Sequence, residues 1–86
     1  MAYQIVYATH ILRTLARLPK SDQARIVERV EMLALNQRPH GSIKLRGENA
    51  YRIRAGDYRI LYTIADDQLI VLVIDIGHRR DVYRRR

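Results

Sequence analysis

The chain has 86 residues, no cysteine, and 16 lysine and arginine residues against 9 aspartate and glutamate residues, which gives a net charge of +7. This length predicts a single domain over residues 1–86 and excludes a large enzyme with an enclosed cofactor pocket. The lack of cysteine excludes disulfide scaffolds, thiolate zinc sites and thiol nucleophiles. The longest apolar run, residues 69–74, is far shorter than the roughly 18 residues of a membrane-spanning helix, and the polar N-terminus does not resemble a signal peptide. We therefore expect a small cytoplasmic protein that makes no membrane contact.

The basic residues are almost all arginine. Lys20 and Lys44 are the only lysines, so 14 of the 16 basic residues are arginine. The guanidinium group forms planar, bidentate contacts with phosphate and stacks on nucleobases. The composition therefore favours a polyanionic partner, either a nucleic acid or an acidic protein that neutralises the charge.

The first half of the chain predicts one strand and two helices. Residues 3–7 have the pattern of a short strand, and helical periodicity begins after them. We expect Thr9 to cap the first helix, Pro19 to end it, Ser21 to cap the second helix, and that helix to finish near Asn36. The apolar stripes of the two helices are Ile11, Leu12, Leu15 and Leu18, and Ile26, Val27, Val30, Leu33 and Ala34.

The second half changes to a period of two. Residues 51–54 and 58–64 alternate around a turn at Gly56-Asp57, and Asp66-Asp67 marks a second turn. Residues 68–76 are almost uniformly apolar, which indicates a central strand. The predicted fold is therefore α+β with the order β-α-α-β-β-β. We expect an antiparallel sheet of three to four strands, with the first strand at its side and both helices on one face.

The turn at Gly56-Asp57 also predicts which residues of the two neighbouring strands pair. A two-residue turn of type II′, with glycine first, pairs Ala55 with Tyr58. Arg54 then faces Arg59, and Arg52 lies on the same side of the sheet. The other side, with Tyr51, Ile53, Ile60 and Tyr62, should be the one that the helices cover.

The predicted pairing places two like charges, Arg54 and Arg59, directly opposite each other, which is unfavourable in an otherwise consistent strand pattern. Like charges across a sheet are destabilising by some tenths of a kcal/mol, and such conflicts are expected at functional sites, where a bound anion relieves them. The alternative interpretation is that the long stems of Arg54 and Arg59 spread apart over the sheet at little cost. We favour the anion site.

The chain ends in a basic segment. Gly77 permits a bend that would return His78 and Arg79 over the open face of the sheet. Tyr83, among arginines, has the character of a base-stacking residue, or alternatively covers the sheet edge. Residues 84–86 are either a solvated chain end or a group of charges that attracts phosphate without a specific contact.

Four segments together resemble the RelE-type toxins of the RelE/ParE superfamily, which belong to bacterial and archaeal type II toxin–antitoxin systems. They are Lys44-Leu45-Arg46-Gly47, Tyr51-Arg52-Ile53-Arg54, Gly56-Asp57-Tyr58-Arg59-Ile60-Leu61-Tyr62 and Gly77-His78-Arg79-Arg80-Asp81-Val82-Tyr83. With the two preceding helices, the resemblance covers essentially the whole chain. It implies a ribosome-dependent endoribonuclease that cleaves mRNA in the A site, without a metal or another cofactor.

The resemblance also implies roles for particular residues. The basic pair of the family falls on Arg52 and Arg54, and its further functional positions fall on Arg59, Arg79 and Tyr83. The best-studied form has lysine at the first two positions, and arginine cannot replace lysine as a proton acceptor because it stays protonated. His78, the only residue in this set with an ordinary pKa near neutrality, is therefore a secondary acid–base candidate. Additional RNA contacts are expected from Lys44, Arg46, Arg80 and Arg84.

In the implied reaction the RNA supplies its own nucleophile, the 2′-hydroxyl. Arg54 and Arg59 would hold the phosphate, Arg52 would orient the 2′-hydroxyl, and Arg79 would assist the departing 5′-oxygen. Which group moves each proton stays open. The implied partners are the ribosome with its mRNA, an acidic RelB-like antitoxin and, only through that antitoxin, operator DNA.

Two other functions remain open at this point. A ParE-like toxin, which inhibits DNA gyrase and performs no chemistry, would share the same order of elements. A plain nucleic-acid-binding module would use the basic face without cleaving its ligand. The arginine set together with Tyr83 favours the nuclease, because a gyrase inhibitor has no evident use for it.

Overall fold

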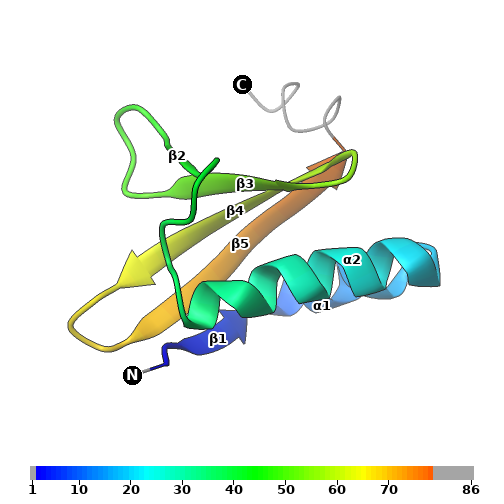
Figure 1. Cartoon of the computed structure of the whole chain (residues 1–86). Helices are drawn as coiled ribbons and strands as arrows, with labels where there is room; N and C mark the ends of the chain where they lie inside the picture. The colour runs from blue at the N-terminus through cyan, green and yellow to red at the C-terminus, as the bar shows by residue number, and fades with distance from the viewer. Residues whose placement is uncertain (1, 79–86) are drawn as a thin grey trace.

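Two helices and five strands make up residues 2–78, the part of the chain that this computed structural model describes. In chain order they are β1 (Gln4–Tyr7), α1 (Thr9–Ala16), α2 (Lys20–Glu31), the short 3₁₀ turn η1 (Met32–Ala34), β2 (Ile43–Lys44), β3 (Tyr51–Ala55), β4 (Tyr58–Ala65) and β5 (Ile70–His78). Figure 1 shows both helices on the same side of β3, β4 and β5, as predicted. Among the described residues no helix is both long enough and apolar enough to cross a bilayer.

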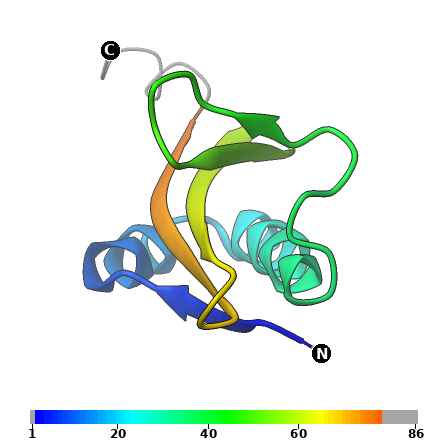
Figure 2. The same cartoon turned by 90° about the vertical axis from the view of Figure 1, so that its left-hand side faces the viewer.

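The sheet has the strand order β1-β5-β4-β3-β2 and is mixed. The pairs β2–β3, β3–β4 and β4–β5 are antiparallel, whereas β1 lies parallel to β5 at the edge. The fold class is confirmed, and β5 is an interior strand between β1 and β4, as predicted. The expected fully antiparallel sheet of three to four strands is wrong in two respects: β1 is parallel, and the two-residue strand β2 adds a fifth strand. Figure 2 shows β1 and β2 at opposite ends of the twisted sheet.

The helix starts differ from the expected caps. Ala8 precedes α1 and Pro19 precedes α2, and neither helix has a side-chain cap. Thr9 is thus the first residue of α1, and Ser21 lies inside α2. The carbonyl of Pro19 accepts the first hydrogen bond of α2, from the backbone N–H of Gln23 at 3.0 Å, so the helix starts directly after the proline. This explains why α2 begins one residue before the predicted cap.

The core lies between the helices and the covered face of the sheet. Its fully buried side chains come from both helices, from η1 and from the three middle strands; the largest are Tyr62, Ile11, Ile26, Leu33, Ile53, Ile60, Val30, Val71 and Val73. Most of the predicted helical stripes are therefore confirmed. Leu12 is an exception at 55% exposed, and Val27 is also on the surface.

The β3–β4 hairpin has the predicted register. Ala55 pairs with Tyr58, Arg54 with Arg59, and Arg52 with Leu61. Gly56 has a φ of 62°, and Asp57 does not adopt a positive φ, which fits the first and second central positions of a type II′ turn. The turn thus places three arginine side chains on the face away from the helices.

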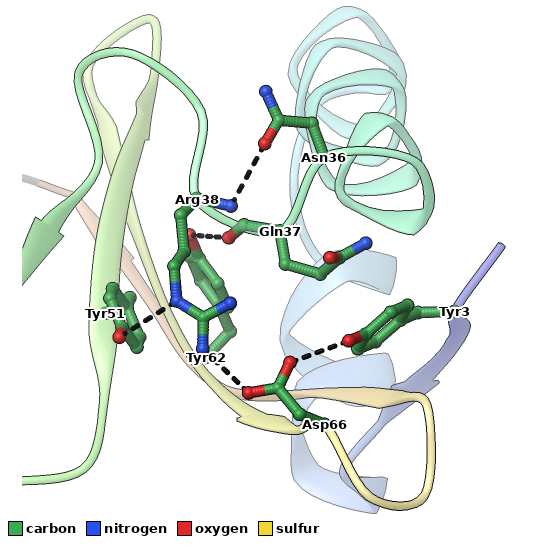
Figure 3. A network of polar contacts seen from close by, with 7 residues as sticks. All are labelled: Tyr3, Asn36, Gln37, Arg38, Tyr51, Tyr62 and Asp66. Carbon is green, nitrogen blue, oxygen red and sulfur yellow. Dashed lines mark hydrogen bonds and ion pairs between the residues drawn. The ribbon is translucent and has the colours of Figure 1, made fainter. Parts of the chain in front are cut away.

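A polar network ties the linker after η1 to the sheet (Figure 3). The guanidinium of Arg38 pairs with the carboxylate of Asp66 at 2.9 Å, lies over the ring of Tyr51 at 5.4 Å, and donates from Nε to the Tyr51 hydroxyl. Asp66 also accepts a hydrogen bond of 2.6 Å from the hydroxyl of Tyr3. Tyr62 donates to the carbonyl of Gln37 at 2.8 Å. The network therefore joins the start of β1, the linker, β3, β4 and the β4–β5 turn.

This network makes the stability of the protein depend on acidity. The hydrogen bonds from Arg38 and then Tyr3 lower the pKa of Asp66 in the folded state. A depressed carboxyl pKa contributes stability above the unfolded pKa of about 4, and that contribution is lost as the pH falls through the folded pKa. We expect Asp66→Asn to flatten the dependence of urea unfolding on pH between about 5 and 2. The neighbouring exposed Asp67→Asn is the matched control, and an equal effect of both variants would contradict the assignment.

Candidate nucleic-acid interface

The face of the sheet away from the helices carries the arginines in two adjacent rows. One row runs across three strands from Arg52 through Leu61 to Asp75, and the next runs from Arg54 through Arg59 to Gly77. Because side chains alternate between the faces of a sheet, all three arginines project to the same side. The structure therefore brings Arg52, Arg54 and Arg59 together, as the hairpin register predicts.

The three arginines differ in exposure. Arg59 is only 5% exposed, Arg52 is half-buried, and Arg54 is open to solvent. Arg54 and Arg59 are directly opposite each other, and the hairpin places them at a position where paired Cα atoms approach to about 4.5 Å. A shallow hollow lies beside them, lined by Arg54, Gly56, Asp57, Tyr58 and Arg59. Of the two facing arginines, Arg54 is thus accessible to an anion from solvent, and Arg59 is largely covered.

Gly77 places no side chain beside the buried arginine. It pairs with Arg59 on the open face and has no side chain, so no β5 side chain stands opposite the Arg59 stem. Asp75, one position earlier on the same face of β5, is the only acidic residue in any described strand. Asp75 is not among the predicted site residues, although a lone carboxylate within an otherwise apolar strand is a signal in the sequence that indicates it.

His78 does not lie with the arginines. The strand β5 continues through Gly77 to His78, which pairs with Tyr58, so the expected bend at Gly77 is wrong. The His78 ring meets the ring of Tyr58 edge-on at 5.7 Å, and the Tyr58 hydroxyl donates to Asp22 on α2 at 3.3 Å. His78 therefore projects to the side that faces the helices, because continuous alternation puts it on the same face as Ile76.

Tyr58 is not a proton acceptor in this arrangement. Partial burial first, and the charge of Asp22 second, raise the pKa of its phenol above the usual value near 10. A neutral phenol donates a hydrogen bond, as Tyr58 does to Asp22. The Tyr58–His78 pair is thus a packing contact between β4, β5 and α2.

The remaining predicted site residues fall into two groups. Lys44 is exposed and pairs with Tyr51, so it projects to the opposite face from Arg52, and Arg46 is exposed in the loop between β2 and β3. That loop forms an open hollow lined by residues 44–49. Arg79, Arg80, Tyr83 and Arg84 lie outside the described residues 2–78.

The fold, the positive charge and the paired arginines agree with the resemblance to the RelE/ParE superfamily. Residues 5–83 match the family model described as the ParE toxin of the type II toxin–antitoxin system parDE. The chain belongs to this family of type II toxins.

Its relatives are RelE-like toxins. Toxin RelG of Mycobacterium tuberculosis is 36% identical over 99% of this chain and 100% of its own length. A putative RelE-like toxin protein of Escherichia coli is 35% identical over 96% of this chain and 92% of its own length. These similarities confirm the resemblance to the RelE toxins that the four sequence segments indicated.

Solved structures of toxin–antitoxin complexes contain chains with a similar fold. The toxin–antitoxin complex RelBE2 of Mycobacterium tuberculosis contains a chain with a TM-score of 0.80 and 29% identity, over 92% of this chain and 100% of that one. The archaeal RelE–RelB complex of Pyrococcus horikoshii contains one with a TM-score of 0.82 and 27% identity, over 92% and 97%. The α+β fold with two helices on one face of the sheet is thus the fold of RelE toxins.

Proposed function

We propose that this toxin is an endoribonuclease that enters the ribosomal A site and cleaves the mRNA there. The observation that carries the proposal is the register of the hairpin, which places Arg52, Arg54 and Arg59 on one face of two adjacent strands. Convergent guanidinium groups suit a reaction in which negative charge accumulates on a phosphate. The similarity to RelE toxins supports the same function.

The reaction uses the 2′-hydroxyl of the RNA as the nucleophile. The 2′-hydroxyl loses its proton as its oxygen forms a bond to the adjacent phosphorus. The bond from phosphorus to the 5′-oxygen breaks, that oxygen takes up a proton, and the products are a 2′,3′-cyclic phosphate and a 5′-hydroxyl. Arg54 and Arg59 hold the non-bridging oxygens and stabilise the pentacoordinate intermediate, while Arg52 orients the 2′-hydroxyl. Arg79 assists the departing oxygen and Tyr83 stacks on a base; for both, the proposal rests on the family resemblance.

Dependence on the ribosome follows from the chemistry of arginine. Its guanidinium stays protonated at any usable pH, so it stabilises charge but does not accept the proton of the 2′-hydroxyl. His78 packs against Tyr58 on the helix side, and we assign it no part in proton transfer. Among the described residues, the open face carries three arginines and one carboxylate, Asp75, and such a site gains most from a partner that already holds the mRNA in line for attack.

The protein partner is an acidic antitoxin of the RelB type. The net charge of +7 favours an acidic chain, and two of the similar solved structures are complexes of RelE with RelB or of the RelBE type. An antitoxin segment that folds on binding would neutralise the arginine face. Contact with operator DNA is expected only through this antitoxin.

Primer extension on mRNA after brief expression tests the function. The wild-type chain should produce cuts in phase with the codons, confined to translated regions, and co-expression of the neighbouring antitoxin gene should abolish them. The family model carries the ParE name, but the curated relatives are RelE toxins, so gyrase inhibition is not favoured. Inhibited supercoiling without mRNA cuts would establish gyrase inhibition and overturn the proposal.

A further inference from the structure

Two arginines of α2 lie beside the β3–β4 turn, and sequence reasoning assigned them no role. Arg25 is exposed and Arg29 is half-buried. They are four residues apart, so they share one face of the helix, with Cβ atoms about 5–6 Å from each other. Since α2 packs against β3, this helix face borders the strand that carries Arg52 and Arg54.

Arg29 contacts the backbone of the proposed site directly. Its Nε donates a hydrogen bond of 3.2 Å to the carbonyl oxygen of Arg54. The short strand β2 pairs with β3 only at Tyr51 and Arg52, so the outer edge of β3 has no strand partner at Arg54. Arg29 thus satisfies an edge carbonyl that the sheet leaves open and brings its guanidinium next to Arg54.

The side chain of Arg25 lies against the β3–β4 turn at Gly56. A Cβ atom placed on Gly56 would lie 2.9 Å from Nη1 and 3.2 Å from Cδ of Arg25. Glycine at this position therefore does two things: it adopts the positive φ of the turn, and it lets the Arg25 side chain lie against the backbone. The Arg25 guanidinium therefore lies beside Gly56, which is itself part of the lining of the hollow next to Arg54 and Arg59.

Two carboxylates lie near this corner, Asp57 in the lining of the hollow and Asp22 at the Tyr58 hydroxyl, and they offset part of its positive charge. No carboxylate within residues 2–78 forms an ion pair with Arg25, Arg29 or Arg54. Three guanidinium groups on two packed elements therefore share one corner of the molecule, which raises the local positive potential and favours a multivalent anion over a single carboxylate.

We propose that Arg25 and Arg29 bind the backbone phosphate next to the one that Arg54 and Arg59 hold, so that the RNA strand runs from the open face around the β3 edge onto α2. This inference extends the proposed function, since it takes RNA as the ligand. RNA is favoured over an acidic peptide because the corner is continuous with the phosphate site through the contact of Arg29 with Arg54.

The test measures binding of a 12-nucleotide single-stranded RNA whose 2′-hydroxyls are methylated, so that it cannot be cleaved. Fluorescence anisotropy over a range of KCl concentrations gives the salt slope of the affinity. Removing two phosphate contacts from a single strand should make that slope shallower by about 1.4. We expect this change for Arg25→Gln/Arg29→Gln, with a loss of affinity on the order of tenfold at low salt.

The control is Arg13→Gln/Arg17→Gln, which removes the same charge from the last turn of α1 and from the residue that follows the helix; α1 packs on β5. It should leave the slope nearly unchanged. Arg29→Lys keeps the charge and should retain the wild-type slope. Equal effects of the two double variants, no effect of Arg25→Gln/Arg29→Gln, or no RNA binding by the wild type would each overturn the inference.

Two further outcomes separate this inference from its alternatives. If Arg25→Gln/Arg29→Gln weakens binding of the acidic antitoxin but not of RNA, the corner is a protein interface and the inference is wrong. If RNA binding depends on Arg25 and Arg29 but mRNA is never cut, the proposed nuclease function fails while this inference stands.

Discussion

Arg59→Gln is expected to lower the rate of mRNA cleavage by about 10²–10³-fold, the usual cost of removing one preorganised donor from a charge-stabilising site. Arg59 is 5% exposed and lies directly opposite Arg54. A guanidinium held in place by burial loses little freedom when it binds a phosphate, so its contribution should exceed that of the exposed Arg54. Single-turnover cleavage on programmed ribosomes measures the rate.

The controls separate chemistry from folding. Arg13→Gln makes the same change of charge on the exposed surface of α1 and should leave the rate within about twofold of wild type, as expected for a surface position away from the site. Arg59→Lys keeps the charge but loses the planar fork, and an intermediate rate is expected. Wild-type cleavage by a folded Arg59→Gln variant would show that the buried guanidinium plays no part in the reaction.

The hairpin could be predicted from sequence because its determinants are local. Gly56 and Asp57 are the residues that a two-residue type II′ turn requires, and such a turn allows one pairing of the strands. Once Ala55 faces Tyr58, alternation assigns every following residue to a face. The turn and this alternation together determine the face of the sheet on which Arg52, Arg54 and Arg59 lie.

The direction of β1 and the presence of β2 could not be predicted in this way. The core-facing residues Ile5 and Tyr7 pair with Val71 and Val73, and an alternating pattern is the same in either direction. The two residues of β2 are both exposed, so they show no periodicity. These features depend on the path of the whole chain rather than on local residue pattern.

The predicted position of His78 is wrong because it assumes a bend at Gly77, whereas the alternation of side chains along the strand gives the correct face. Strict alternation from the buried Ile76 places His78 on the helix side, where it meets Tyr58. The prediction of a bend at Gly77 places His78 on the open face instead, and that prediction is wrong. A glycine permits a bend but does not require one, and here the ladder to β4 holds β5 straight through Gly77.

The α2 arginines were missed for a different reason. Periodicity places Arg25 and Arg29 on the polar side of an amphipathic helix, where charged residues are ordinary. Only the packing of α2 beside β3, with the Arg29 contact to the Arg54 carbonyl, gives them a position relative to the site. That contact spans 25 residues, and a local pattern carries no information about it.

Ile60→Ala is expected to destabilise the protein by about 2–5 kcal/mol, the range for truncating a fully buried isoleucine. Ile60 is 0% exposed and pairs with Ile53 on one side and Ile76 on the other. A chain of this length has a free energy of unfolding on the order of 5–10 kcal/mol, so the loss is a large share of the total. Urea unfolding followed by circular dichroism measures it.

The same variant tests whether the two faces of β4 act independently. Ile60 and Arg59 are neighbours in the chain but lie on opposite faces of the sheet. Under conditions where both variants remain folded, the cleavage rate of Ile60→Ala should stay near that of wild type, whereas Arg59→Gln should lose cleavage. Ile60→Val, which should cost only about 0.5–1.5 kcal/mol, serves as the graded control. A folded Ile60→Ala variant as inactive as Arg59→Gln would mean that core packing, rather than the strand register alone, positions the arginines.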